Sequence, residues 1–267
     1  MRSLHASYSC KDSNNPGVNV MDRMLYIAMS GAKEVMLSQA NNSNNLANAN
    51  TDGFKKDFNI FRAQHVQGPG WESRAYSLDE RPATDFTPGA VKVTGRGLDI
   101  GTQSEGFIGI QAPDGGEAYV KTASMQVLEN GDLVDVKGNP VLNESSTPIN
   151  LPPTKTITIG DDGTISIVPA DAESNQLVVL DRIRLVKPAV ADLEKGLDGY
   201  ARLKEGANPV IQEPVKVISG ALETSNVNTA EALVNMIELS RKYEMQVKMM
   251  STTKSHAQKS DSLLSIS

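Results

Sequence analysis

Residues 21–55 read MDRMLYIAMSGAKEVMLSQANNSNNLANANTDGFK. Alternating steps of four and three separate a series of residues in this stretch: Leu25, Met29, Ala32, Met36, Gln39, Ser43 and Leu46. This spacing is typical of a heptad seam, and it predicts a helix from Asp22, a suitable N-cap, to about Asn48. Asp52 and Gly53 then interrupt the pattern. The sequence therefore predicts an N-terminal helical unit over residues 21–53.

A second seam lies at the other end of the chain. Steps of three and four again separate a series of residues: Leu233, Met236, Ser240, Tyr243, Val247 and Met250. Residues 221–267 contain no glycine or proline, and Thr229 is a candidate N-cap, so we expect a second long helix there. Isolated helices take most of their stability from packing. We therefore expect residues 221–267 to pair with residues 21–53 as a coiled coil.

The middle of the chain, residues 54–220, alternates short β-branched runs with turn signals. Asn130-Gly131 and Asp162-Gly163 supply the positive φ that tight hairpin turns require. These patterns predict a mainly antiparallel all-β domain and an α+β fold. Residues 62–88, which contain Gly68-Pro69-Gly70 and the lone Trp71, are expected to be an irregular segment of this domain.

Charge and hydropathy exclude several classes of protein. The net charge is −6, and residues 67–228 carry −9 while each end is close to neutral. A nucleic-acid-binding protein would present a basic face, and none is evident. No apolar run reaches the roughly 18 residues of a membrane span. Residues 1–20 lack the apolar core of a secretory signal peptide.

Candidates for enzymatic chemistry are weak throughout the sequence. The three histidines, His5, His65 and His256, lie in different parts of the chain and lack metal-ligand spacing. Cys10, the only cysteine, lies in a polar stretch without a nearby base. Glycines at 95–106 precede strand-like residues and lack the Gly-Lys-Ser/Thr of a phosphate-binding loop. We therefore predict no catalytic residue, no metal and no cofactor, and a protein that is not an enzyme.

Two features permit more than one interpretation. Six asparagines fall within residues 41–51, which indicates either a frayed helix end or a helix whose amides pair with neighbouring chains. The methionines of residues 244–250 suit either packing within the chain or an interface with several partners. Residue types alone leave both questions open.

Three separated motifs carry a resemblance to a known family. Residues 44–55, NNLANANTDGFK, resemble a signature of the flagellar axial proteins, which form the rod, hook and hook-associated segments; Ser43 stands where the family usually has alanine. Residues 220–228, GALETSNVN, resemble the family's second signature. Residues 85–100 resemble its β-domain entry, and the segments 21–32 and 236–250 are closest to the proximal-rod branch.

The resemblance implies a structural subunit of the proximal rod, a torque-transmitting hollow drive shaft crossing the periplasm. It implies helical polymerisation with other proximal-rod proteins and a distal-rod protein, and export by the flagellar type III apparatus without a cleaved signal peptide. Combined with the seams, it predicts an assembly interface formed by the following residues: Leu25, Met29, Met36, Asn44, Asn45, Leu46, Asn48, Thr51, Gly53, Phe54, Val227, Asn228, Leu233, Met236, Tyr243, Val247 and Met250.

Residues 1–20 fall outside the resemblance, since the family-like start is Met21. We interpret them as an unstructured extension or a wrongly assigned start. One alternative is a distal-rod or hook-type axial protein. Another, of a different class, is a soluble β-rich ligand-binding module with helical dimerisation ends.

Overall fold

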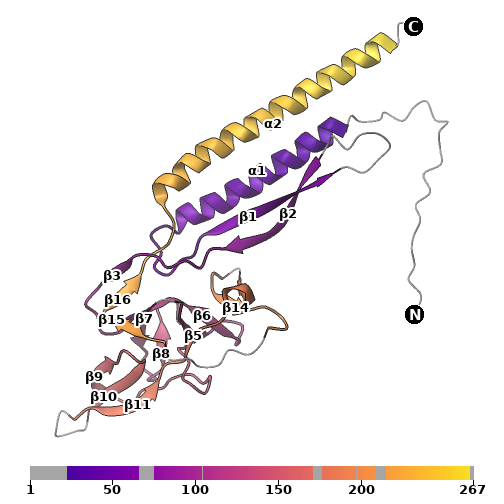
Figure 1. Cartoon of the computed structure of the whole chain (residues 1–267). Helices are drawn as coiled ribbons and strands as arrows, with labels where there is room; N and C mark the ends of the chain where they lie inside the picture. The colour runs from indigo at the N-terminus through magenta and orange to yellow at the C-terminus, as the bar shows by residue number, and fades with distance from the viewer. Residues whose placement is uncertain are drawn as a thin grey trace, which may run out of the picture.

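The computed structural model describes residues 23–65, 75–103, 105–170, 176–196, 198–207 and 215–264. The expectations for residues 1–20, for Gly68-Pro69-Gly70 and for Trp71 lie outside the described residues. Two long helices form an elongated arm, and a β-rich head lies at one end of it (Figure 1). Helices at both chain ends with antiparallel strands between them confirm the predicted α+β fold.

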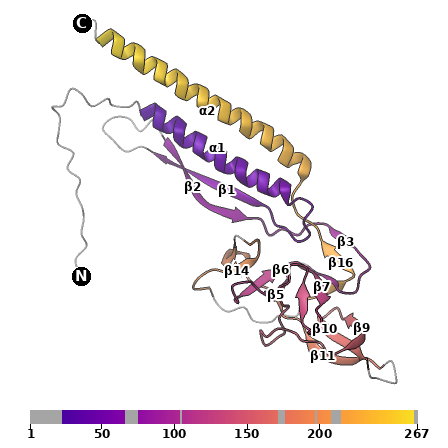
Figure 2. The same cartoon turned by 180° about the vertical axis from the view of Figure 1, so that it is seen from behind.

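The arm is built on α1 (Arg23–Ala47) and α2 (Thr229–Leu264), which run antiparallel side by side (Figures 1 and 2). Two contacts fix their register. The side-chain amide of Asn42 donates to the Ala232 carbonyl at 2.7 Å. Near the other end, a Cβ on Gly31 would lie 3.0 Å from Nε2 of Gln246, so this glycine lets the helices approach closely. The predicted contact between the two terminal helices is confirmed.

The face that α2 turns inward differs from the predicted seam. Its buried and half-buried residues again step by four and three: Ala232, Met236, Leu239, Tyr243, Gln246, Met250 and Thr253. Leu233 and Val247, which the sequence placed on the seam, are 50% and 41% exposed. Met236, Tyr243 and Met250 of the predicted seam are half-buried, as predicted, whereas the residues one position before Leu233 and Val247 face inward in their place.

The N-cap of α2 also differs from the prediction. The Asn228 side-chain oxygen accepts hydrogen bonds from the backbone N–H groups of Ala230 at 3.0 Å and Glu231 at 3.2 Å. These two groups otherwise have no acceptor inside the helix. Asn228 is therefore the cap, one residue before Thr229.

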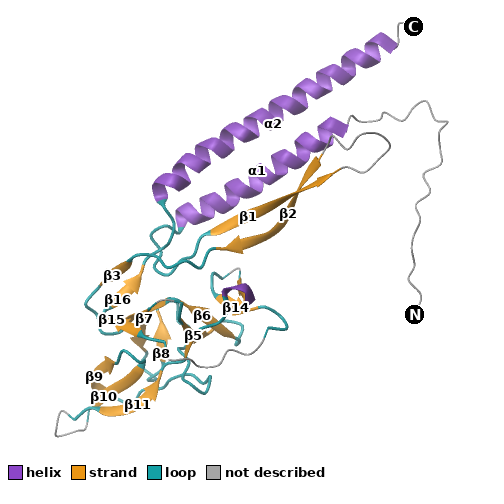
Figure 3. Cartoon of the chain, viewed as in Figure 1, coloured by secondary structure: helices purple, strands orange, loops and turns teal. Residues whose placement is uncertain are grey.

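A β-hairpin replaces the irregular segment expected at residues 62–88. Strands β1 (Asp57–His65) and β2 (Ala75–Thr84) pair antiparallel, with a bulge between Phe58 and Ile60, and lie along α1 (Figure 3). The hairpin thus belongs spatially to the arm, although the sequence assigned it to the outer β-rich domain. The Gly-Pro-Gly segment between the strands concealed the strand pattern.

Asn45 fixes the position along α1 at which the β1–β2 hairpin is attached. Its side-chain amide accepts from the Asp57 backbone N–H at 2.9 Å and donates to the Asp57 carbonyl at 2.7 Å. The amide thereby replaces a neighbouring strand at the start of β1. Asn41 likewise donates to the side chain of Asn59. These asparagines act within the chain, which settles for them the question that the sequence left open.

The head comprises β4 to β15, and its sheets are antiparallel. A five-stranded sheet has the order β12-β5-β6-β14-β13, formed by Leu185–Val186, Phe107–Gln111, Glu117–Val120, Ala201–Leu203 and Leu193–Lys195. A four-stranded sheet has the order β15-β4-β7-β8, formed by Val217–Ser219, Asp99–Thr102, Thr122–Val127 and Leu133–Asp135. A three-stranded sheet has the order β11-β10-β9, formed by Val178–Arg182, Thr164–Pro169 and Thr154–Ile159. A short 3-10 helix spans Val190–Asp192.

The head has a core of branched aliphatic side chains. Its fully buried members come from several of the sheets: Ile100, Ile108, Ile110, Met125, Leu133, Ile165, Ile167, Ile183 and Leu185. This composition matches a sequence with only 4% aromatic residues. Gly131 and Gly163 adopt φ of 87° and 82° in hairpin turns, as their Asn-Gly and Asp-Gly contexts predicted.

Candidate assembly surface and the joint between arm and head

Two chain segments cross between the arm and the head, and they meet a third segment, which links α1 to β1 at the end of the arm. We call this region the joint. It consists of residues 53–57, residues 85–90 and residues 223–228. Just on the head side, β3 (Val91–Val93) pairs with β16 (Ala221–Glu223). The first segment follows the asparagine-rich end of α1, and the third leads into α2. The joint therefore brings together residues from the two motifs of the sequence that lie furthest apart.

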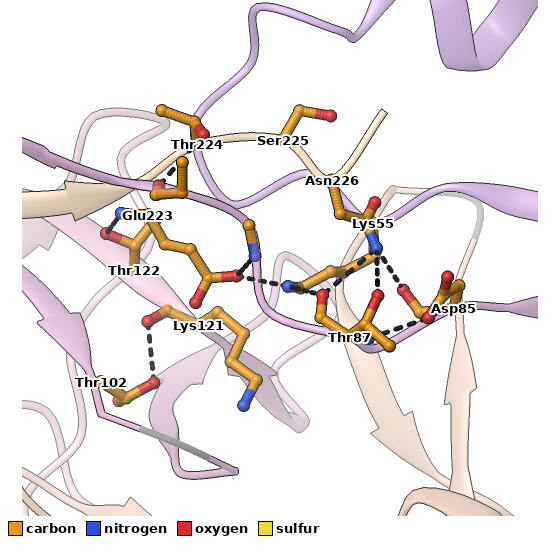
Figure 4. Close-up of polar contacts among 12 residues, drawn as sticks. Lys55, Asp85, Thr87, Thr102, Lys121, Thr122, Glu223, Thr224, Ser225 and Asn226 are labelled. Carbon is orange, nitrogen blue, oxygen red and sulfur yellow. Dashed lines mark hydrogen bonds and ion pairs between the residues drawn. The ribbon is translucent and has the colours of Figure 1, made fainter. Parts of the chain in front are cut away.

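A buried ion pair lies at the centre of the joint (Figure 4). The Lys55 ammonium contacts the Glu223 carboxylate, and the two side chains are only 6% and 4% exposed. The ammonium also donates to the Thr87 carbonyl at 2.7 Å. The Glu223 carboxylate accepts from the Gly89 backbone N–H at 2.9 Å. Each charge thus has a second partner on the middle segment, as a buried ion pair requires.

Asn226 connects the same three segments through one amide (Figure 4). Its oxygen accepts from the Lys56 backbone N–H at 2.8 Å, and its nitrogen donates to the Asp85 carbonyl at 2.9 Å. Nearby, the Asp85 carboxylate accepts from the Thr87 N–H at 2.9 Å and lies 3.3 Å from the Lys56 ammonium. Burial opposes ionisation, but the Thr87 hydrogen bonds and the Lys56 charge hold the pKa of Asp85 below its ordinary value.

Two glycines allow the backbones to meet. The Gly53 N–H donates to the Glu223 carbonyl at 2.7 Å, and Gly53 has φ of 74°, which favours glycine. A Cβ on Gly89 would overlap the carbonyl oxygen of Thr224. A side chain at Gly89 would push the crossing segments apart, and one at Gly53 would meet the Thr122 side chain of β7, with its Cβ 2.8 Å from Cγ2.

The head contacts the first segment directly through Lys195, on β13. Its ammonium donates to the Lys55 carbonyl at 2.7 Å and pairs with the Asp57 carboxylate at 2.8 Å. It also lies 4.0 Å from the centre of the Phe54 ring, a cation–π distance. This side chain therefore links the head to the start of the arm hairpin.

Lys121 is a second buried lysine beside the joint. It is 4% exposed, and its ammonium lies 4.2 Å from the centre of the Phe107 ring. Burial lowers the pKa of Lys121 to about 8, although the Glu223 charge acts in the opposite direction. Phe107 also packs edge-to-face with Phe86 of the middle segment, with ring centres 6.1 Å apart. Apolar packing and charge therefore join the head to the joint.

The arm exposes many large apolar side chains, which we call the arm surface. They come from α1, α2 and β1: Met24, Tyr26, Met29, Met36, Leu37, Phe58, Ile60, Phe61, Leu233, Val234, Ile237, Met245 and Val247. Met36 and Met245 are 57% and 62% exposed. Helices that are apolar around much of their circumference are usually buried on more than one side. The arm surface therefore has the character of an interface that other chains cover.

Comparison with known proteins agrees with this arrangement. Residues 102–167 match the family model "Flagellar hook protein FlgE/F/G D1 domain", and residues 218–263 match "Flagellar basal body rod FlgEFG protein C-terminal". The flagellar basal-body rod protein FlgF of Escherichia coli K12 is 38% identical over 92% of this chain and 100% of its own length. The chain belongs to the FlgF family of flagellar basal-body rod proteins. The FlgF of Salmonella typhimurium LT2 is 35% identical over the same shares, and the FlgG of Bacillus subtilis 168 is 30% identical over 87% and 96%.

Membership of the FlgF family confirms the prediction that the chain is a flagellar axial protein. The chain is a structural subunit of the flagellar basal-body rod rather than an enzyme, and it assembles with other rod subunits. Among the described residues, neither helix is long and apolar enough to cross a membrane. The same residues contain no cluster of side chains suited to hold a metal ion.

The residues predicted for the FlgF-family interface fall into three groups in the structure. Exposed residues are Met29, Met36, Asn44, Thr51, Asn228, Leu233 and Val247. Half-buried residues are Leu25, Leu46, Asn48, Gly53, Phe54, Val227, Met236, Tyr243 and Met250. Asn45 is buried and bonded within the chain. The first group contains the residues that remain available to a partner.

Sequence reasoning named Gly53, Phe54, Val227 and Asn228 of the joint, but it missed the side chains that bond its segments together. Lys55, Glu223 and Asn226 all lie within the quoted motifs, but none was singled out. A signal was present for Glu223, because a single carboxylate follows the apolar pair Ala221-Leu222 in a segment that is buried throughout. A lone charge in such a context usually has a buried partner.

Proposed function

We propose that the chain is a proximal-rod subunit that polymerises helically with neighbouring rod proteins through the arm surface. The arms form the inner wall of a hollow shaft, and the heads lie outside. Contacts that do not close into a ring generate a helical filament, in which each subunit has several neighbours. The neighbours are other proximal-rod proteins and, at one end, a FlgG-like distal-rod protein.

The observation that carries this proposal is the exposure of apolar side chains on both helices of the arm. Leu233, Val234 and Ile237 follow one another on α2 and are 50%, 56% and 56% exposed. Fully burying one large aliphatic side chain contributes about 1.5–3 kcal/mol, so covering the exposed half of one of these residues contributes roughly 1 kcal/mol. Several such residues on each subunit together favour its assembly between neighbours.

We also propose that the chain reaches the rod by the flagellar type III export apparatus, without a cleaved signal peptide. The support is the membership of the family of flagellar basal-body rod proteins. An epitope-tagged chain should be exported in a strain with the apparatus and retained in the cell in a strain without it.

The interface is tested with Met36→Ser and Leu233→Ser, introduced together. Since both side chains are exposed, the free energy of unfolding of the isolated chain should change by less than about 1 kcal/mol. The variant should nevertheless fail to enter the rod, as measured by its content in purified basal bodies and by swimming.

The matched control is Val136→Ser together with Val179→Ser, two exposed apolar residues of the head at 66% and 67%. This variant should enter the rod normally. Normal rod assembly by the arm variant would contradict the proposal. Position within the rod is read from cross-links formed by Leu233→Cys; links only to hook-type proteins would exclude the proximal rod.

A further inference from the structure

The connection between arm and head is the place where this chain would be expected to bend. Two bodies joined by short connecting segments usually move relative to one another, and a hinge is a few residues that absorb changes in φ and ψ. Here, however, the two crossing segments, residues 85–90 and 223–228, are bonded to each other and to residues 53–57 at the end of the arm. Lys55 and Lys56 bond to both of the other segments, and Glu223 and Asn226 do the same from the opposite side.

These bonds form a closed cycle. Lys55 joins the first segment to the third through Glu223, and to the second through the Thr87 carbonyl. Glu223 joins the third segment to the second through the Gly89 N–H. Asn226 repeats two of these connections within one amide, those of the third segment to the first and to the second. A rotation of the arm about either crossing segment must therefore break bonds that this segment or the other one makes with residues 53–57.

Burial makes those bonds costly to break. Lys55 and Glu223 are almost inaccessible to water, so a bend that separates them leaves two charges without either a partner or solvent. An exposed pair would exchange its partner for water at little cost. The joint therefore resists bending because its polar groups are both buried and paired.

The head adds a fourth attachment. Lys195 bonds to the Lys55 carbonyl and to the Asp57 carboxylate, and its own side chain is 10% exposed. The arm hairpin is thus held to β13 as well as to the crossing segments. Asn45 then holds the same Asp57 to α1 through two backbone hydrogen bonds. A continuous series of bonds runs from the head sheet to the helix.

We infer that Lys55, Glu223 and Asn226 are positioning residues that fix the angle between arm and head before the subunit enters the rod. Two of the motifs that mark the family thereby have a role inside the subunit: they set its shape. Where the chain acts as a shaft subunit, as proposed above, the joint also carries torque from the inner arm to the outer head.

The angle is measured on the isolated full-length chain by double electron–electron resonance. Spin labels are placed at exposed positions, Lys33→Cys on the arm and Val136→Cys on the head, in a Cys10→Ser background that removes the only native cysteine. Wild-type joint residues should give one narrow distance distribution. Lys55→Met should broaden the distribution at least twofold under conditions where the chain remains folded.

Controls separate positioning from stability. Arg184→Met removes a comparable ion pair with Glu117 inside the head, and it should lower the melting temperature without broadening the distribution. Asn226→Asp, which has the same shape but loses the donor to the Asp85 carbonyl, should broaden it. If the joint variants lower the melting temperature and leave the distribution narrow, the residues only stabilise the fold and the inference is wrong.

The role of the joint in carrying torque is tested by measuring swimming speed in media of increasing viscosity. Strains carrying Asn226→Asp should swim at near-normal speed at low load and lose at least half of their relative speed at high load. If the distance distribution broadens but the dependence of swimming speed on load is unchanged, the positioning role stands and the role in carrying torque is rejected. The arm-surface variant could enter the rod normally while the joint variants broaden the distance distribution. That outcome would reject the proposed polymerisation and leave the positioning inference standing.

Discussion

The ion pair at the joint permits a quantitative prediction. Lys55→Met keeps most of the side-chain volume but removes the charge that faces Glu223, whose side chain is 4% exposed. Breaking a buried pair by removing one partner costs about 3–5 kcal/mol, because the remaining charge stays buried without compensation. The hydrogen bond from the Gly89 N–H and the attraction of the nearby Lys121 charge offset only part of this loss. We therefore expect the free energy of unfolding to fall by about 3 kcal/mol.

The second substitution decides whether charge is the cause. Glu223→Gln keeps an acceptor for the Gly89 N–H and removes the remaining charge. The double variant Lys55→Met/Glu223→Gln should therefore be more stable than Lys55→Met alone, by about 1–2 kcal/mol. The assay is urea denaturation of the full chain followed by circular dichroism, with all four members of the cycle measured together. Strictly additive effects, or a loss below about 1 kcal/mol for Lys55→Met, would refute this reasoning.

Three further predictions concern the backbone, the helix cap and pH. Gly89→Ala should destabilise the chain by about 2 kcal/mol or more in urea denaturation, because its Cβ overlaps a carbonyl oxygen, whereas Gly97→Ala, with open space around it, should change little. Asn228→Ala should cost about 1 kcal/mol and speed amide hydrogen exchange in the first turn of α2; an equal effect of Thr229→Ala would count against the assigned cap. The pKa of Lys121 falls from 10.5 to about 8 on folding, so unfolding takes up a proton between these values, and the free energy of unfolding should rise from pH 8 to pH 10. Lys121→Met should flatten that rise, and an unchanged slope would exclude this lysine as its source.

The sequence predicted well those elements that local patterns specify. Heptad spacing placed the first helix at 22–48, and the structure has it at Arg23–Ala47. The second helix, Thr229–Leu264, lies within the predicted range 221–267, but residues 221–223 form β16 and do not belong to the helix. Asn-Gly and Asp-Gly marked real hairpin turns because positive φ is a local requirement. Interactions between residues close together in the sequence are sufficient to specify these features.

The same patterns could not reveal which faces meet. On α2 the stripe containing Leu233 and the stripe containing Ala232 have equal periodicity, and only the partner helix distinguishes them. The β1–β2 hairpin depends on packing along α1, since two strands alone are marginally stable. Lys55 and Glu223 are 168 residues apart, and local spacing carries no information about such a contact.

The asparagines within residues 41–51 show that a motif can be recognised correctly while the role predicted for its residues is incomplete. The sequence associated Asn45 with contacts between subunits, because amides both donate and accept. In the structure its amide is fully used by the backbone of Asp57. A side-chain amide next to the unpaired edge of a strand stabilises the subunit more by bonding to that edge than by remaining at the surface.

The separation of Lys55 from Glu223 also constrains the order in which the chain can acquire its shape. A ribosome releases the N-terminal half first, so the residues of α1 and of the head strands are synthesised before the segment that contains Glu223 and Asn226. Closing so long a loop adds entropic cost that only the completed partners can offset. The final geometry of the molecule is therefore among the last things to be established, and a chain truncated before residue 223 lacks the residues needed to establish it.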